Sequence, residues 1–114
     1  MNKFSDIMKA LGDKNRYHIV ESLLQHNFCV GALAKKLGMS ESAVSQHLKI
    51  LRNVGIVQGE RKGYYTHYSV NRDLLRAAAK ELTALAELEK TSLECSKSHG
   101  SNHSCSRKEL KQHG

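Results

Sequence analysis

Apolar residues recur at helical spacing from the start of the chain. They predict a first helix over residues 4–11, which ends at Gly12, and a second over residues 14–25, for which Asp13 is a suitable N-cap. Each helix has one apolar face, so both are expected to pack against a shared core. The apolar positions are Phe4, Ile7, Met8 and Leu11 in the first helix and Ile19, Val20, Leu23 and Leu24 in the second.

Two further helices follow with only a few residues between them. The first covers residues 30–37 and ends at Gly38, a residue type that tolerates positive φ. The second covers about residues 42–52, with Ser40 as its N-cap and Glu41 adding negative charge to its first turn. Helices joined this tightly cross at a steep angle. This arrangement is typical of a helix-turn-helix, whose second helix enters the major groove of DNA.

The second helix of this pair has two distinct faces. Its apolar stripe consists of Ala43, Val44, Leu48 and Leu51. The opposite face carries short hydrogen-bonding side chains and cations, which suit base edges and phosphates. An amphipathic surface helix without a DNA-binding role is the alternative that this pattern alone leaves open. The predicted DNA contacts are Ser40, Ser42, Ser45, Gln46, Lys49 and Arg52, with His47 on the flank of the same face.

Alternating residues downstream predict a β-hairpin. Residues 57–61 and 64–70 read as two strands, and the second has a clear period of two. The predicted turn, residues 61–63, is basic and contains a glycine. A helix-turn-helix followed by a basic hairpin indicates a winged helix. The wing is expected to reach the phosphate backbone or the minor groove through Arg61, Lys62 and Tyr64.

The last apolar stripe lies on a long predicted helix over residues 71–94, a segment without glycine or proline. A domain this small cannot fully cover such a stripe, so we expect a homodimer formed through the first and last helices. Packing of the stripe on its own domain is the alternative. A twofold dimer also suits DNA, because two recognition helices can read two half-sites. The stripe consists of Leu74, Leu75, Ala78, Leu82, Leu85 and Leu88.

The composition changes after this helix. The chain has 114 residues, and those from Cys95 onward are rich in Ser, His and Lys with almost no apolar side chains. We expect one winged helix-turn-helix domain for DNA binding and dimerisation over residues 1–94 and a flexible tail over residues 95–114. The predicted fold class is mainly α with a small β-hairpin.

Charge and hydropathy narrow the class of function. The net charge of +7 indicates a polyanionic partner, and double-stranded DNA is consistent with the predicted helices. No apolar run approaches the roughly 20 residues that span a bilayer, and no signal peptide is visible, so we expect a cytoplasmic protein without a membrane partner. The chain has no Ser/His/acid set in a pocket-forming context, no glycine-rich phosphate loop and no paired carboxylates, so catalysis is not expected.

The order of these elements resembles the ArsR/SmtB family of bacterial metal-responsive repressors. The resemblance covers roughly residues 4–93, and it implies a homodimeric repressor that binds its operator when ligand-free and releases it when an inducer binds. The family's DNA-reading positions then fall on residues 42, 45, 46, 47 and 49, with 61, 62 and 64 on the wing. The segments that carry the resemblance are residues 10–13 with Arg16, 33–34, 42–51, 55–57, and 61–63 leading into 68–70.

The family's inducer sites are not preserved in this chain. A Cys-x-Cys pair at the start of the helix before the turn reads Cys29-Val30-Gly31 here, so one thiol is missing. A second family site uses carboxylates and histidines of the last helix. The corresponding positions are Arg72, Leu74, Leu85 and Leu88, none of which is a useful ligand. A Zn(II) or Co(II) sensor built on that helix is therefore not expected.

The remaining thiols and imidazoles gather in the tail, as Cys95, His99, His103 and Cys105. These donors suit thiophilic or borderline ions such as Zn(II), Cd(II) and Cu(I). A three-thiolate site with Cys29, suited to As(III), is an alternative, and a buried structural role for Cys29 is another. A disulfide or persulfide between the tail cysteines would need no metal. An architectural DNA-binding protein without an inducer is the last alternative.

Overall fold

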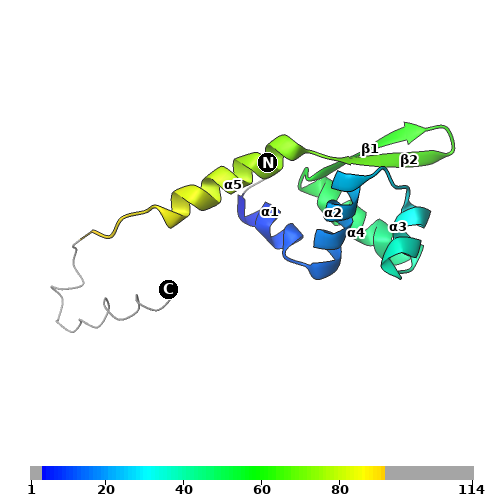
Figure 1. Ribbon diagram of the computed structural model, residues 1–114. Helices are drawn as coiled ribbons and strands as arrows, with labels where there is room; N and C mark the ends of the chain where they lie inside the picture. Colours follow the sequence, from blue (N-terminus) through cyan, green and yellow to red (C-terminus); the bar gives the residue numbers. More distant parts are fainter. Residues whose placement is uncertain (1–3, 92–114) are drawn as a thin grey trace.

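The computed structural model describes residues 4–91 of the chain. In this part, five helices and a two-stranded hairpin follow one another (Figure 1). The hairpin comes directly after the fourth helix, and the last helix leads away from the body. The elements are α1 (Phe4–Leu11), α2 (Lys14–Gln25), α3 (Val30–Leu37), α4 (Glu41–Asn53), β1 (Val57–Lys62), β2 (Tyr65–Val70) and α5 (Arg72–Ala86).

The core lies where α2, α3 and α4 meet the start of the hairpin. Its members are mostly the predicted apolar positions, which confirms the helical patterns of the first four helices. The largest fully buried side chains are Ile19 of α2, Leu33 of α3, Val44, Leu48 and Leu51 of α4, and Ile56 and Val57 at the hairpin.

The predicted face of α1 is wrong at one position. Met8 is 39% exposed, whereas Ile7 and Ala10 are buried. Residues three apart lie on the same side of a helix, so Ile7 and Ala10 face the core together. Met8 then lies at the edge of this buried side and remains partly exposed to solvent. The exposed apolar side chain of Met8 therefore belongs to a helix, α1, that contacts α5.

Both predicted N-caps are confirmed. Asp13 Oδ2 accepts hydrogen bonds from the backbone N–H groups of Asn15 (3.0 Å) and Arg16 (3.1 Å). Ser40 Oγ accepts from the backbone N–H of Ala43 at 3.0 Å. Gly38 ends α3 at φ 67°, in the left-handed conformation that a side chain would disfavour. The turn between α3 and α4 is therefore short and well defined.

The hairpin turn lies one to two residues later than predicted. Lys62 pairs with Tyr65, so Gly63 and Tyr64 form the turn and Arg61 and Lys62 remain in β1. Gly63 has φ 67°, and a two-residue hairpin turn requires such a value. The predicted alternation holds in part, because Thr66, Tyr68 and Val70 are partly buried on one side of β2. His67 on the other side is partly buried as well, and Tyr64 lies in the turn.

The last helix is shorter than predicted. It begins after Asn71, whose side chain caps it by accepting from the Leu74 N–H, but it ends at Ala86 rather than near residue 94. Every residue from 79 to 91 is exposed. A helix without tertiary contacts is marginal in water, so good helix formers alone do not extend it. No helix within residues 4–91 is both long and apolar enough to cross a membrane.

The cap of α2 makes a pH-dependent contribution to stability. The backbone hydrogen bond from Arg16, together with the positive charge nearby, lowers the pKa of Asp13 below its ordinary value of 3.8. A lowered folded-state pKa means that the charge stabilises the fold above the unfolded value, and that this stabilisation is lost as pH falls through the folded value. Asparagine is also a good N-cap, so Asp13→Asn removes the charge alone.

We therefore expect Asp13→Asn to unfold at a lower temperature than the wild type at pH 7. The difference should shrink as the pH is lowered past 3.8. Thermal unfolding of both proteins over a pH series at constant ionic strength checks this, because other carboxyl groups titrate alike in the two proteins. An equal difference at pH 7 and pH 3 would contradict a contribution from the Asp13 charge.

Candidate nucleic-acid interface

The polar face of α4 is open to solvent over its whole length. Ser42, Ser45, Gln46 and Lys49 border one shallow hollow of about 320 Å³. All four side chains are exposed, because Val44, Leu48 and Leu51 on the other side of the helix are buried. This hollow offers hydroxyl, amide and ammonium groups side by side, the chemistry that suits base edges and phosphates.

Two predicted contacts lie at the ends of this face. Ser40 is exposed just before α4, and its Oγ already accepts the capping hydrogen bond from Ala43. Arg52 is exposed in the last turn. Its positive charge lies at the helix C-terminus, where it interacts favourably with the negative end of the helix dipole. Ser40 thus has a structural role, and its hydroxyl hydrogen and one remaining lone pair are available to another partner.

His47 lies apart from the other predicted contacts. Its side chain is only 19% exposed, and its Nδ1 lies 3.4 Å from Arg16 Nη1 and 4.0 Å from Asp13 Oδ2. The ring therefore faces the corner between α1 and α2 rather than the open side of α4. The sequence predicted Asp13 as a helix cap and used Arg16 only for the resemblance, so this cluster of side chains was not predicted.

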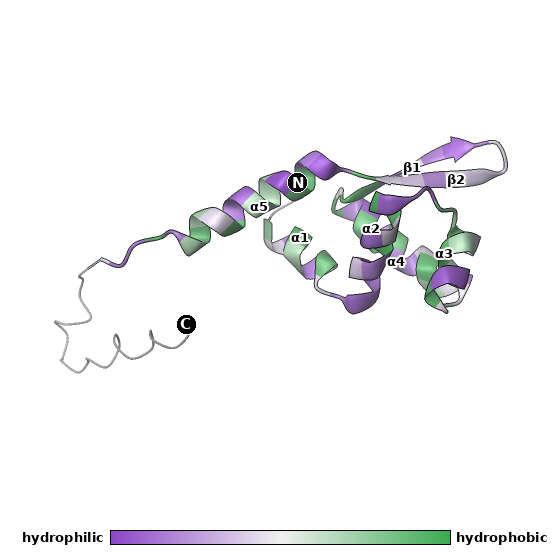
Figure 2. Cartoon of the chain, in the orientation of Figure 1, coloured by the Kyte–Doolittle hydropathy of each residue, from purple (hydrophilic) through white to green (hydrophobic). Residues whose placement is uncertain are grey.

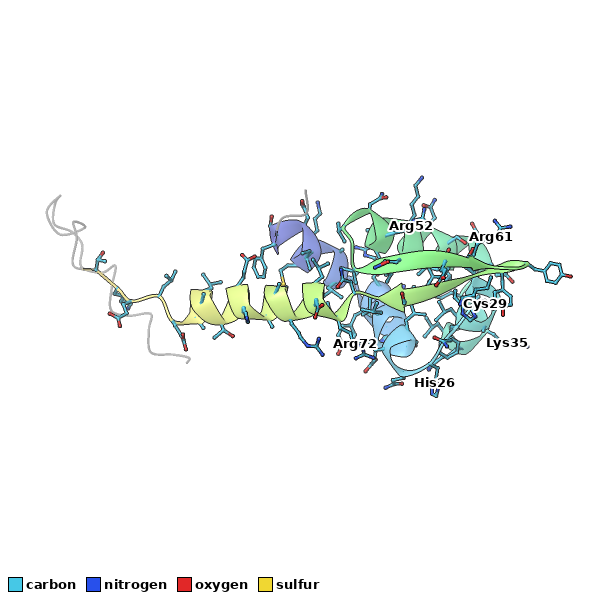
Figure 3. All side chains as sticks on the ribbon, turned by 90° about the horizontal axis from the view of Figure 1, so that it is seen from above. His26, Cys29, Lys35, Arg52, Arg61 and Arg72 are labelled. Carbon is cyan, nitrogen blue, oxygen red and sulfur yellow. The ribbon has the colours of Figure 1, made fainter. Side chains whose placement is uncertain are left out.

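The wing brings the other predicted contacts to the surface. Arg61 and Lys62 are exposed on β1, and Lys62 Nζ is 4.0 Å from Glu60 Oε1. Tyr64 is 98% exposed at the turn. In Figure 3, Arg52 of α4 and Arg61 of β1 lie on the same side of the body, and His26 and Arg72 lie on the other. Cations from α4 and from the wing are thus available to one elongated partner.

A glycine in the wing leaves room for two side chains of the facing strand. A Cβ at Gly59 would lie 3.1 Å from both Thr66 Cγ2 and Tyr68 Cε1, which is tighter than ordinary contact. The Tyr68 ring therefore lies across β1 at this position. Sequence reasoning missed this contact, although a glycine inside a predicted strand is typical of close approach.

Cys29 is the free thiol that the structure describes. It is the residue before α3, half-buried, and its side chain makes no capping hydrogen bond. It borders a hollow of about 390 Å³, together with Val30 and Gly31 on one side and wing residues between 61 and 68 on the other. Cys29 is thus not a fully buried core residue, and it lies beside the wing (Figure 3).

The other predicted ligands, Cys95, His99, His103 and Cys105, lie outside the described residues. Within residues 4–91, no three His, Cys, Asp or Glu side chains gather closely enough to hold a metal ion. The described part of the chain therefore supplies one thiol, Cys29, and any site built on it needs further donors.

Comparison with known proteins defines the family. The family model described as "Bacterial regulatory protein, arsR family" matches residues 13–58. The nodulation protein NolR of Rhizobium meliloti is 38% identical over 81 residues, which are 71% of this chain and 64% of NolR. The arsenical resistance operon repressor of Bacillus subtilis is 33% identical over 72 residues, which are 62% of this chain and 69% of that repressor. The chain belongs to the arsR family.

A solved structure supports the fold. A homodimeric winged helix-turn-helix DNA-binding domain from Mycobacterium bovis, a possible ArsR-family regulator, has a TM-score of 0.61 and 28% identity. The likeness covers 79% of this chain and 85% of that domain. The match with NolR spans slightly less than two thirds of that relative. Family and fold together identify this chain as an arsR-family winged helix-turn-helix domain.

Two substitutions separate base reading from backbone contact in this family member. Gln46→Ala should lower the preference for the cognate sequence, by about 1–3 kcal/mol if the amide contacts a base. Lys62→Ala should weaken binding to all DNA about equally, because a phosphate contact carries no sequence information. It should also reduce the salt slope, which is the change of the logarithm of the binding constant with the logarithm of the salt concentration, because fewer counterions are released. Titration of cognate and random duplexes at several salt concentrations measures both effects.

Lys80→Ala on α5 is the matched control for the loss of one positive charge, because Lys80 is exposed and lies on a helix that packs mainly against α1. It should leave both the preference and the salt slope close to wild type. If Lys62→Ala changed sequence preference and left the salt slope intact, the wing would not be a backbone contact.

Proposed function

We propose that the protein is a homodimeric transcriptional repressor that binds a two-half-site DNA operator and releases it when a thiophilic metal or metalloid ion binds. The observation that carries the DNA-binding part is the exposed polar face of α4 with a basic wing beside it. Membership of the arsR family also supports DNA binding. The release step is supported by the thiols and imidazoles that the DNA-binding elements do not use.

The dimer is supported by the apolar side chains that α5 leaves uncovered. Leu74, Leu75 and Ala78 pack against the core, but Leu82 and Leu85 of α5 are 46% and 58% exposed. Leu88, two residues beyond the end of α5, is 74% exposed. Figure 2 shows apolar and polar positions alternating along α5 as it leaves the body. A second copy that covers this stripe, and the exposed Met8 of α1, completes the burial. The similar domain from Mycobacterium bovis is a homodimer.

A charge placed in this stripe tests the dimer. Leu85→Glu should dissociate the protein into monomers, because burying an unpaired carboxylate between two helices is costly. Lys80→Glu is the matched control: it places the same carboxylate on α5 but outside the stripe, and helix propensities change little in either variant. Sedimentation at several protein concentrations measures the assembly. A Leu85→Glu protein that remains a stable dimer would contradict the proposed interface.

The ligand set is proposed to come mainly from the tail. Cys95 and Cys105 supply thiolates, and His99, His103 or Cys29 completes the site. The chemistry of these donors fits Zn(II), Cd(II), Cu(I) or As(III). The half-buried Cys29 lies next to the wing, so its ligation would connect ion binding to a DNA-binding element. One relative is named as an arsenical resistance operon repressor, and another as a nodulation protein.

The same thiols support a second candidate, release by thiol oxidation. Cys29 is a free thiol with partial exposure, so an oxidant or a persulfide donor can reach it from the hollow beside the wing. A disulfide between Cys95 and Cys105, formed as the two thiols lose two electrons and two protons to the oxidant, would need no metal. A persulfide that a donor leaves on Cys29 would need none either. This candidate differs from the first in one respect: a reductant restores DNA binding, whereas a chelator does not.

Removal of the tail tests the proposed ligand set. A chain that ends at Glu94 should bind DNA like the full chain but no longer release it with Zn(II), Cd(II) or As(III). The double variant Cys95→Ser/Cys105→Ser should likewise bind DNA and fail to release it with metal. The single variant Cys29→Ser is measured beside it, to show whether the thiol outside the tail contributes to release. DNA affinity and thiolate absorption are followed in one titration. Full metal response in the truncated chain would exclude the tail as the source of ligands.

A further inference from the structure

A group of polar side chains joins the corner between α1 and α2 to the recognition helix α4. Arg16 is at its centre. Its Nε donates to the carbonyl oxygen of Ala10 at 2.7 Å, in the last turn of α1. Its backbone N–H donates to Asp13 Oδ2, so the residue is held at both its main chain and its side chain. These bonds fix the guanidinium on the side of the corner that faces α4.

The free end of this guanidinium meets His47. Arg16 Nη1 lies 3.4 Å from His47 Nδ1. A guanidinium can only donate, so a hydrogen bond between these two atoms requires Nδ1 to accept and the ring hydrogen to be on Nε2. The contact is between residues 31 apart in sequence, and it joins the recognition helix to the rest of the body.

Asp13 does not replace Arg16 as the partner of His47. Its Oδ2 is 4.0 Å from His47 Nδ1 and already accepts from two backbone N–H groups at 3.0 Å and 3.1 Å. The carboxylate therefore orders the corner, and the guanidinium makes the link. With the ring 19% exposed and turned toward the corner, His47 is poorly placed to reach a base.

We propose that His47 is a positioning residue: through Arg16, it sets the orientation of α4 relative to the α1–α2 corner, and it reads no base itself. The proposal rests on the proposed DNA-binding function. Its consequence concerns coupling between elements. α1 contacts both α4 and α5, so a change where α1 and α5 meet can reach the recognition helix through Arg16 and His47.

Two conservative substitutions distinguish positioning from direct contact. The Oδ1 of an asparagine takes the place of the histidine Nδ1 and can accept from Arg16. The amide of a glutamine instead reaches the place of Nε2, the outward nitrogen that a DNA contact would use. His47→Asn should therefore retain near-wild-type preference for the operator, whereas His47→Gln and His47→Ala should lose about tenfold or more.

The experiment uses the full chain and a duplex that the wild-type protein selects from a random pool, with a scrambled duplex of equal length for comparison. The ratio of the two affinities, the salt slope and the thermal unfolding midpoint are measured for each variant. A positioning role lowers the ratio for His47→Ala and His47→Gln and leaves the salt slope unchanged. If wild-type protein selected no duplex, the proposed function itself would fail, independently of His47.

The rescue by asparagine should also require Arg16. In an Arg16→Met background, the ratio for His47→Asn should equal that for His47→Ala. A nitrogen-15 NMR spectrum of the His47 imidazole in the wild-type protein gives a measurement that needs no variant. It should show hydrogen on Nε2 and none on Nδ1. Rescue by glutamine but not asparagine, or hydrogen on Nδ1, would overturn the proposal.

Discussion

The burial of one side of α4 is the constraint on which the proposed DNA-binding surface depends. Val44, Leu48 and Leu51 are almost inaccessible to solvent, and they contact a core that α2 and α3 share. Because α-helical positions repeat every 3.6 residues, fixing these three side chains inward fixes the direction of every other position on the helix. The recognition surface thus results from hydrophobic packing on the opposite side. One face of α4 packs in the core, and the opposite face carries the polar side chains.

This division explains why the first four helices could be predicted well from the sequence. Their apolar stripes, the caps at Asp13 and Ser40, and the end of α3 at Gly38 are local signals, and local and tertiary preferences agree. The exposed set on α4 follows from the same periodicity. The family resemblance depended largely on these segments, together with short segments of the wing, which is why it was already visible in the sequence.

The predictions that failed concern contacts between distant residues. Helix propensity favoured an α5 that reaches residue 94, but nothing in the described chain packs on its end, and it stops at Ala86. The wing turn was misplaced because strand pairing, not composition, decides which residues form it. The position of His47 could not be read from α4 alone, since its partner Arg16 is on another helix. The sensing residues pose a different problem, because most of them lie beyond residue 91.

The uncovered leucines of α5 have a consequence for how the regulator responds to its own abundance. Two chains must meet before the stripe is buried, so the amount of assembled dimer rises with the square of the free monomer concentration when the protein is scarce. Occupancy of an operator that needs both recognition helices then changes more steeply than the amount of protein produced. In the proposed repressor, the hydrophobicity of Leu82 and Leu85 would thereby set the protein concentration above which the operator becomes occupied.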